Sequence, residues 1–208
     1  MNDTISSQHK EAQPLSLRER KKRLVQSTIE ETALQLFQQR GYEHTSIQDI
    51  ADAVMMSTRT FFRYFASKEE VLFGPMHIAL SESIHFLQHV APVDSPHTAL
   101  KATFAHLASL YQQQQNSFLI RYRVAIQTPS IASIYIYALL EREPAISEAL
   151  CSRRKFTISY LEIRALVALY MTAFRLALEL WLANEAQGDL VSLLQENLNY
   201  FSSFSRNV

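Results

Sequence analysis

Apolar residues recur along the chain at a spacing that predicts helices almost throughout. In residues 17–40, for example, Ile29, Ala33 and Phe37 follow one another at helical spacing and would share one face of a helix. Gly41 then has the position of a glycine that ends a helix. The chain holds only three glycines, fewer than the tight hairpins of a multi-stranded protein usually require. We therefore predict an all-α protein of about nine helices.

Two short helices are predicted after the first long one. Ser46 can cap the first of them, in which Ile47 and Ile50 are apolar, and Ser57 can cap the second, residues 58–65. Neither is long enough to be stable by itself, so both must pack on each other and on the preceding helix. This arrangement is typical of a helix-turn-helix, whose second helix is free to enter the major groove of DNA.

The rest of the chain has the pattern of long amphipathic helices. We predict them at residues 76–90, or 68–90 if the helix continues through a kink at Pro75, and then at 95–114, 117–127, 128–154 with a bend, 160–184 and 189–204. Residues 1–16 are polar and are predicted to form a disordered tail. A helix-turn-helix head would then span residues 17–77, and a helical body would span residues 78–208.

Charge changes this picture only locally. The formal net charge is zero, so the chain as a whole has no general attraction to nucleic acid. Residues 18–23, however, hold five basic residues and one acidic residue, and residues 57–68 hold three basic residues and no acidic one. Either run alone fits a solvated helix surface equally well. Beside a helix-turn-helix, the first run would add non-specific attraction to the DNA backbone.

The chain has no predicted feature of a secreted or membrane protein. Cys151 is its single cysteine, which excludes an intramolecular disulfide and fits a reducing compartment. The polar N-terminal segment lacks the apolar core of a signal peptide. The most apolar stretch, residues 165–178, is shorter than a membrane span. We expect a cytoplasmic protein that makes no membrane contact.

An enzymatic function is the main alternative from another class, and the sequence offers it little support. His85 and His89 lie four residues apart with Glu82 on a similar face, a spacing that can bind a metal ion. No fourth ligand is evident, and we find neither a glycine-rich loop nor a nucleophile motif. We therefore expect no metal site, no cofactor and no enzymatic activity.

Residues 41–72, with the sequence GYEHTSIQDIADAVMMSTRTFFRYFASKEEVL, resemble the DNA-binding head of the TetR family of regulators. The matching pieces are Gly41-Tyr42, Thr45-Ser46-Ile47, Asp49-Ile50-Ala51, Ser57, Thr60, Phe62, Tyr64-Phe65 and Ser67-Lys68-Glu69-Glu70. The resemblance extends over about residues 18–77 and includes the preceding helix around Ala33-Leu34-Gln35-Leu36-Phe37. One departure is Met55, where the family usually has glycine; this residue is strained if the turn requires a positive φ.

The resemblance implies a sequence-specific transcriptional regulator, most often a repressor, that binds a palindromic DNA operator as a homodimer. The recognition helix would be residues 58–65, with Thr58 and Arg59 as first choices for base contacts and Arg63 for a base or a phosphate. Family positions suggest a base contact for Gln48 and a phosphate contact for Lys68, while hydroxyls suit phosphate oxygens. The predicted DNA contacts are Ser46, Gln48, Thr58, Arg59, Thr60, Phe62, Arg63, Tyr64 and Lys68. Phe61 and Phe65 fit the core better, and Phe62 fits either the core or the DNA backbone.

In this family the body encloses a small molecule, and its last two helices form the dimer interface. Residues 160–184 are apolar nearly all round, so this helix needs partners on two sides, its own core and a twin subunit. The predicted dimer seam is Leu166, Tyr170, Phe174, Trp181, Leu190, Leu194, Leu198 and Phe201. The candidate pocket residues are Phe86, Phe104, Tyr111, Phe118, Tyr122, Tyr135 and Tyr137, although most aromatic residues at helical spacing belong to a core.

We expect an unidentified small-molecule effector to change the separation of the two heads, so that they no longer fit half-sites about one helical turn apart. The open alternative is a DNA-binding regulator whose body docks a protein partner. A closed, filled bundle would favour the partner, and a cavity of a few hundred Å³ would favour an effector.

Overall fold

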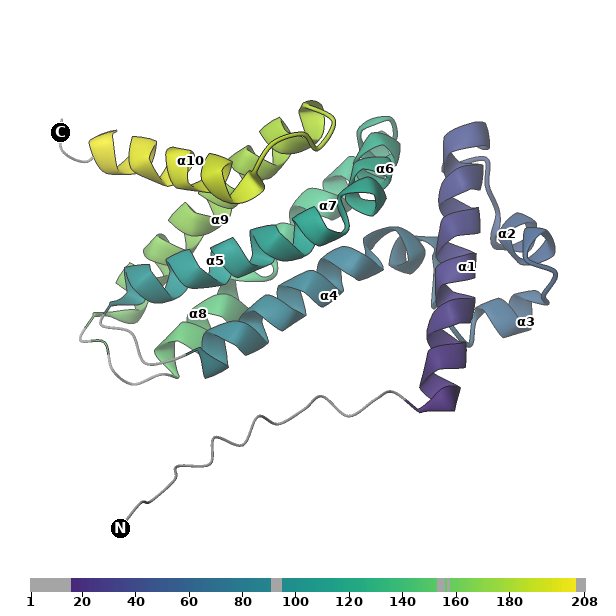
Figure 1. Cartoon of the computed structure of the whole chain (residues 1–208), viewed down its shortest axis with the longest axis horizontal. Helices are drawn as coiled ribbons and strands as arrows, with labels where there is room; N and C mark the ends of the chain where they lie inside the picture. The colour runs from purple at the N-terminus through teal and green to yellow at the C-terminus, as the bar shows by residue number, and fades with distance from the viewer. Residues whose placement is uncertain (1–15, 91–94, 153–155, 157, 205–208) are drawn as a thin grey trace, which may run out of the picture.

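The computed structural model describes residues 16–90, 95–152, 156 and 158–204, with the backbone alone at residues 135, 136, 138, 139 and 204. Within these residues the chain forms ten helices and no strand (Figure 1). They are α1 (Leu17–Arg40), α2 (Ile47–Ala53), α3 (Thr58–Phe61), α4 (Lys68–His89), α5 (Pro96–Gln113), α6 (Gln115–Ile126), α7 (Pro129–Leu140), α8 (Glu143–Cys151), α9 (Tyr160–Ala183) and α10 (Leu190–Phe204). The predicted disordered tail lies outside the described residues except for Ser16, which caps α1.

Serine residues set where most of the helices begin. A capping serine accepts a hydrogen bond from the backbone N–H three residues later, which satisfies one of the free donors of the first turn. The structure shows this bond at Ser16, Ser46, Ser57, Ser67, Ser95 and Ser159. The predicted caps at Ser46 and Ser57 are thus confirmed.

One helix expected in the body is two in the structure, which raises the described count from nine to ten. The predicted helix 128–154 divides into α7, which ends at Leu140, and α8, which starts at Glu143. Pro144 lies in the first turn of α8, where its missing N–H costs nothing. Within a continuous helix, its ring would clash with the carbonyl four residues earlier. Proline therefore starts a new helix here instead of bending one.

The longer of the two alternatives for residues 68–90 is confirmed, because α4 is one helix of 22 residues with Pro75 inside it. Pro75 is buried, and it leaves the carbonyl of Val71 without its usual helical donor. This helix leaves the head and runs along the body, crossing the boundary expected after residue 77 (Figure 1). Helix α1 of the head packs on both α4 and α6.

The body packs its helices around a core to which α9 contributes most. Trp181 is fully buried, and its indole N–H donates to the carbonyl of Gly188 at 3.2 Å, in the turn before α10. Helix α9 packs on α5, α8 and α10. Among the described residues it is also the one helix long and apolar enough to cross a membrane. The apolar composition of α9 is that of a core helix, because one of its faces is buried in the body.

Five of the eight residues expected at the dimer seam lie inside one subunit. These five are less than 5% exposed and belong to the core: Tyr170, Phe174, Trp181, Leu190 and Leu194. Their assignment to the seam is corrected, because the neighbouring helices of the same subunit cover the apolar face on which they lie. The other three, Leu166, Leu198 and Phe201, are half-buried and remain available to a partner.

Candidate nucleic-acid interface and body cavity

The head is held together by aromatic residues from several of its elements. Phe61 of α3 is fully buried, and its ring lies 5.9 Å from that of Phe65. Phe37 of α1 contacts Tyr42 with ring centroids 4.9 Å apart. The placement of Phe61 and Phe65 in the core is therefore confirmed, and it fixes which side of α3 remains exposed.

The turn between α2 and α3 contains the residue that departs from the family pattern. Met55 has a φ of 55°, in the left-handed region, and its side chain is 94% exposed. Its N–H donates to the carbonyl of Asp52 at 3.0 Å, and the N–H of Met56 donates to that of Ala51 at 2.9 Å. These bonds hold the turn in a conformation that is unfavourable for a residue with a Cβ atom.

The predicted recognition helix is shorter in the structure than residues 58–65. Helix α3 ends at Phe61, and residues 62–64 form a tighter turn instead of completing the helix 58–65. In this turn Arg63 donates to Thr60 at 3.1 Å and Tyr64 donates to Phe61 at 2.8 Å, each to a carbonyl three residues back. The tightening accompanies the burial of both Phe61 and Phe65 in the core.

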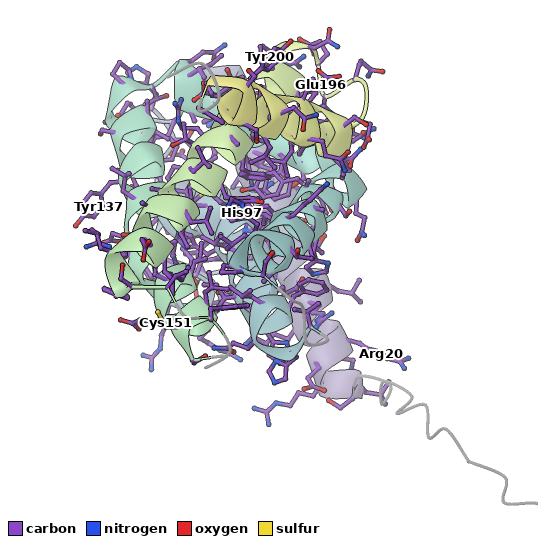
Figure 2. The ribbon with its side chains drawn as sticks, turned by 90° about the vertical axis from the view of Figure 1, so that its left-hand side faces the viewer. Arg20, His97, Tyr137, Cys151, Glu196 and Tyr200 are labelled. Atoms are coloured by element: carbon purple, nitrogen blue, oxygen red, sulfur yellow. The ribbon has the colours of Figure 1, made fainter. Side chains whose placement is uncertain are left out.

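The most exposed of the predicted DNA-contact side chains lie on the outer side of α3 and of the turn that follows it. Arg59 and Arg63 are exposed, and Phe62 is 54% exposed. The guanidinium of Arg63 lies 5.9 Å from the centre of the Tyr64 ring. Thr58 is half-buried. The basic residues of 18–23 are exposed on the first turns of α1, where Figure 2 labels Arg20.

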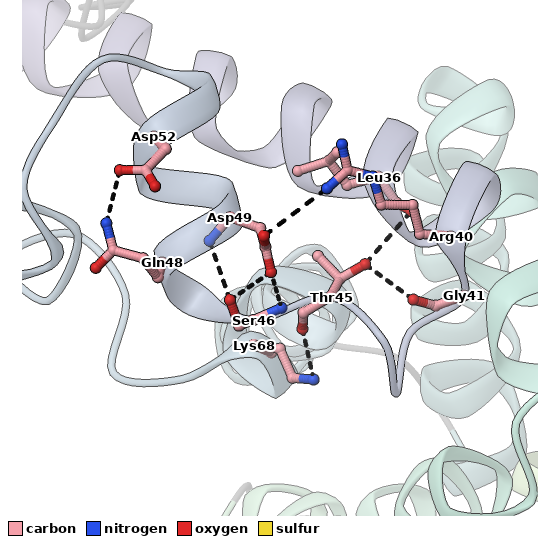
Figure 3. A network of polar contacts seen from close by, with 9 residues as sticks. All are labelled: Leu36, Arg40, Gly41, Thr45, Ser46, Gln48, Asp49, Asp52 and Lys68. Carbon is pink, nitrogen blue, oxygen red and sulfur yellow. Dashed lines mark hydrogen bonds and ion pairs between the residues drawn. The ribbon is translucent and has the colours of Figure 1, made fainter.

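Three other predicted DNA contacts already have partners within the head. The Ser46 hydroxyl forms a capping box with Asp49, and Asp49 also lies 3.8 Å from the guanidinium of Arg40 (Figure 3). The Gln48 amide donates to the carboxylate of Asp52 at 2.6 Å. Thr60 shares a hydrogen bond of 2.9 Å with the capping Ser57. Contacts within the head therefore already orient these side chains.

Lys68 has a structural task that the sequence did not predict. Its ammonium group donates to the carbonyl of Tyr42 at 3.0 Å and to that of Thr45 at 2.9 Å (Figure 3 shows the second bond). It also lies 4.3 Å from the centre of the Tyr42 ring. Two of its three N–H groups are thus engaged, so the expected phosphate contact would have to share this lysine with the loop between α1 and α2.

Tyr42 and Thr45 complete this loop and were not among the predicted site residues. The Tyr42 hydroxyl donates to the carboxylate of Glu69 at 2.6 Å, and burial together with this bond raises the pKa of Tyr42 well above its ordinary value. The Thr45 hydroxyl, which is fully buried, donates to the carbonyl of Gly41 at 2.9 Å. Both belong to the matched family pieces, but only the structure gives them this positioning role.

In the body, three of the predicted pocket residues line one cavity. Tyr111, Phe118 and Tyr122 surround a hollow of about 190 Å³, which we call the body cavity, together with Leu72, Met76 and Arg121. A second cavity of about 140 Å³ shares Met76 and Tyr111 with it and is also lined by Phe104. The rings of Tyr111 and Phe118 stack at 3.9 Å.

Two predicted pocket residues lie elsewhere, and one cannot be placed. Tyr137 is 62% exposed on α7 and points outward (Figure 2). Phe86 stacks on His106 at 4.4 Å and lines a separate surface hollow with His85 and His89. The prediction that Tyr137 and Phe86 line the pocket is wrong, because α7 and α4 place these positions away from the interior. The side chain of Tyr135 lies outside the described residues.

His85 and His89 lie on one face of α4, with their rings stacked at 4.1 Å. The Nδ1 atom of His89 is hydrogen-bonded to the carbonyl of His85 at 2.8 Å. Among the described residues, no three histidine, cysteine, aspartate or glutamate side chains are grouped so that they could hold a metal ion. The fold therefore adds no support for a metal site at these two histidines.

Arg121 is one of two charged residues on the wall of the body cavity, with Glu179, that sequence reasoning missed. It is 5% exposed, and its guanidinium donates to the carboxylate of Glu30 on α1 at 2.8 Å. Burial raises the pKa of Glu30, an effect that Arg121 opposes, and burial lowers the pKa of Arg121. The available signal was an arginine on the apolar face of the predicted helix 117–127, between Phe118 and Val124.

Comparisons with known proteins agree with this geometry. Residues 29–73 match the family model of bacterial regulatory proteins of the tetR family, and residues 94–204, more than half of the chain, match the model of the MftR C-terminal domain. The transcriptional regulator TcmR of Streptomyces glaucescens is 31% identical over 144 residues, which cover 66% of this chain and 63% of that protein. MftR of Mycobacterium tuberculosis is 30% identical over 112 residues, which cover 53% of this chain and 57% of MftR.

The matched region spans less than two thirds of the length of these curated relatives. Solved structures show the same fold at lower identity. A TetR-family regulator from Syntrophomonas wolfei superposes with a TM-score of 0.60 at 17% identity and covers 89% of this chain and 95% of its own. The repressor FadR of Thermus thermophilus gives a TM-score of 0.53 at 23% identity over 84% and 91% of the two chains. With its helix-turn-helix and its matched body, the chain belongs to the TetR family of DNA-binding transcriptional regulators, a non-enzymatic family.

Proposed function

We propose that this regulator binds a palindromic operator as a homodimer and represses transcription until a small molecule enters the body cavity. The observation that carries the proposal is an apolar cavity of about 190 Å³ in the body, adjoining the helices that support the head. A pocket lined mainly by apolar side chains with a few polar groups is typical of small-molecule binding. Since DNA is the target, the protein would act in the cytoplasm.

The body cavity and its neighbour, of about 190 and 140 Å³, together favour an effector over a docked protein partner. A body that served only as a docking platform would need no interior space, whereas here two neighbouring cavities share Met76 and Tyr111. FadR of Thermus thermophilus was solved in complex with lauroyl-CoA, which is a precedent for an apolar effector in this fold. We propose an effector with a substantial apolar part.

Exposed side chains of the head supply the proposed DNA contacts. Arg59 lies in the first turns of α3 and would reach base edges, because the N-terminal end of a recognition helix points into the groove. Arg63 would bind a base or a phosphate, and Phe62 would lie against the sugar–phosphate backbone. Thr58 and Gln48 are further proposed base contacts, whereas Ser46, Thr60, Tyr64 and Lys68 would contact phosphates.

The proposed homodimer uses the outward faces of α9 and α10. Leu180 is 57% exposed and lies close to a whole number of helical turns from the half-buried Leu166, so that both share one face of α9. On α10, Leu198 and Phe201 are half-buried, and Tyr200 is 63% exposed (Figure 2). Two such faces related by a two-fold axis would bury these apolar groups against each other.

The test is binding of the purified protein to the DNA upstream of its own gene, followed by selection from random sequences, over a series of salt concentrations. Replacement of Arg59 and Arg63 by alanine is expected to weaken specific binding by about 10- to 100-fold, since one bidentate arginine contributes about 1–3 kcal/mol of discrimination. The variant should also reduce the salt dependence, because any phosphate contact made by these residues is lost.

The matched control removes two positive charges from the body, with Lys101→Ala and Arg164→Ala, and should leave operator binding nearly unchanged. If neither the upstream DNA nor the selection yields a specific site, the proposal of an operator-binding repressor is wrong. If the double head variant and the body control lose equal DNA affinity, the interaction depends on overall charge and not on these two arginines.

A further inference from the structure

Arg121 connects the DNA-binding head to the wall of the body cavity. Its Nη2 atom donates to Glu30 of α1 at 2.8 Å, and its Nη1 atom donates to Ser117 of its own helix, α6. Its side chain also lines the body cavity. Polar contacts between head and body also include a hydrogen bond of 2.6 Å from Ser130 to Glu43, which is exposed. The Arg121–Glu30 pair is therefore a partly buried polar tie between α1 and α6.

The fold holds this arginine in place through a third helix. Pro75 has no N–H group, so the carbonyl of Val71 cannot make its usual bond within α4. The Nη2 atom of Arg121 donates to that carbonyl at 3.3 Å. The guanidinium thus links α1, α4 and α6 at one point, directly beside the cavity.

One polar atom at this point has no partner. A guanidinium has five N–H donors, and the four on Nη1 and Nη2 suffice for Glu30, Val71 and Ser117. The Nε atom of Arg121 is buried and has no hydrogen-bond partner among the residues that the structure describes. Leaving such a donor unpaired is unfavourable, which makes it a natural partner for an acceptor brought in by a ligand.

The chemistry of the cavity wall indicates which ligand would supply that acceptor. Arg121 shares the wall with one other charged residue, Glu179, whose carboxylate already pairs with Arg175 at 2.7 Å. The wall is otherwise mostly apolar and includes Leu72, Met76 and Phe118. Glu30 engages Arg121 through a single N–H···O bond, whereas a carboxylate approaching from the side can use Nε and Nη2 together.

We propose that the body cavity binds an amphipathic carboxylate, whose alkyl chain fills the apolar space and whose carboxylate takes Arg121 from Glu30. This inference rests on the proposed function, since it names the effector class and the release step of the same cavity. One N–H of Nη2 is held by the Val71 carbonyl, so the other serves either Glu30 or the ligand, and the ligand and the Arg121–Glu30 pair exclude one another. The Glu30 side chain is 28% exposed and can turn to water when it is released.

Release of Glu30 removes the ionic tie between α1 and α6, and the head is then free to change its angle on the body. A ligand that binds only the released state shifts the protein toward that state. By the same linkage, operator DNA and the carboxylate weaken each other's binding, by about 5- to 150-fold for couplings of ordinary size.

The test uses dodecanoate as the probe and dodecanol as its uncharged counterpart, with binding to the full chain measured by calorimetry. The wild type should bind dodecanoate at least about tenfold more tightly than dodecanol. Arg121→Met should lose this preference. Glu30→Gln should tighten dodecanoate binding, because it removes the competing carboxylate, and should leave dodecanol binding unchanged. If Glu30 had only a structural role, Glu30→Gln would weaken dodecanoate binding or leave it unchanged.

Arg123→Met is the matched control. Arg123 lies on the same helix and is also ion-paired, with Glu185, but it does not line the body cavity. The control should bind both probes like the wild type. In the wild type, dodecanoate should also speed amide hydrogen exchange in α1 around Glu30, a readout that needs no variant to fold.

Equal binding of the two probes to the wild type, no binding of dodecanoate, or unchanged exchange in α1 would each overturn the inference. Neither calorimetry nor exchange requires DNA. A protein that selects no operator would therefore count against the proposed function, and a protein that fails these tests while binding its operator would count against the carboxylate site alone.

Discussion

Met55 shows how one residue can store strain in a turn that the rest of the head needs. Its φ of 55° would suit glycine, while its exposed side chain gains little from packing. The left-handed conformation costs a residue with a Cβ atom about 1–2 kcal/mol. Part of that cost is offset because methionine has less freedom than glycine in the unfolded chain.

We expect Met55→Gly to raise the free energy of unfolding by about 0.5–1 kcal/mol, because it relieves strain at the expense of unfolded-state entropy. Urea denaturation of the purified protein measures this difference. Met55→Ala is the control, since it keeps the Cβ atom and the strain. If the glycine variant is no more stable than the alanine variant, Met55 is not strained in solution.

Elements of the head depend on a few polar side chains that join one helix to the next. Lys68 begins α4, yet its ammonium group binds the backbone of the loop between α1 and α2. Thr45 closes the same loop onto the end of α1 through the carbonyl of Gly41 (Figure 3). Because α2 has only seven residues, its position depends on these ties more than on its own stability.

We expect Lys68→Met to lower the free energy of unfolding by about 1.5–3 kcal/mol, the range for hydrogen bonds to a charged group. Thermal unfolding without DNA measures it. A lysine whose task was only to bind phosphate would change stability by less than about 0.5 kcal/mol, as expected for the exposed control Lys101→Met. Equal stability of the two variants would return Lys68 to the role of a simple phosphate contact.

At the scale of the whole molecule, α9 has to serve both a core and, we propose, a twin subunit. Its buried face carries Trp181 and Phe174, while Leu180 and Leu161 remain exposed. A single subunit leaves this apolar surface in water. Burying it in a two-fold interface would also set the separation of the two heads, on which the proposed operator binding would depend.

We expect Leu180→Glu to weaken dimerisation by at least about tenfold, because the two-fold axis would bring like charges together in an apolar interface. Sedimentation over a range of concentrations measures the change. Ile78→Glu is the control: Ile78 is 59% exposed on α4, outside the proposed interface, and should leave the mass unchanged. A wild type that is monomeric throughout, or a Leu180 variant with the mass of the wild type, would contradict the proposed interface.

Much of the local structure followed from the sequence, because helix periodicity and capping depend on residues close together in the chain. The structure confirms the capping serines Ser46 and Ser57, the helix-ending Gly41, and the helix-turn-helix formed by α2 and α3. Local patterns failed where two demands competed. Burial of Phe61 and Phe65 accompanies a tightened turn after α3, and Pro144 divides one expected helix into two.

The sequence by itself thus determined the helical class, the DNA-binding head and the residues of its outer face. Tertiary structure decided which apolar residues belong to the core, so that Trp181 lies inside one subunit. It also decided which charged side chains form ion pairs. Arg121 and Glu30 are separated by 91 positions, and nothing in either segment alone indicates the other. Such contacts arise only when packed helices bring buried polar groups together, because each group must then find a partner that water no longer supplies.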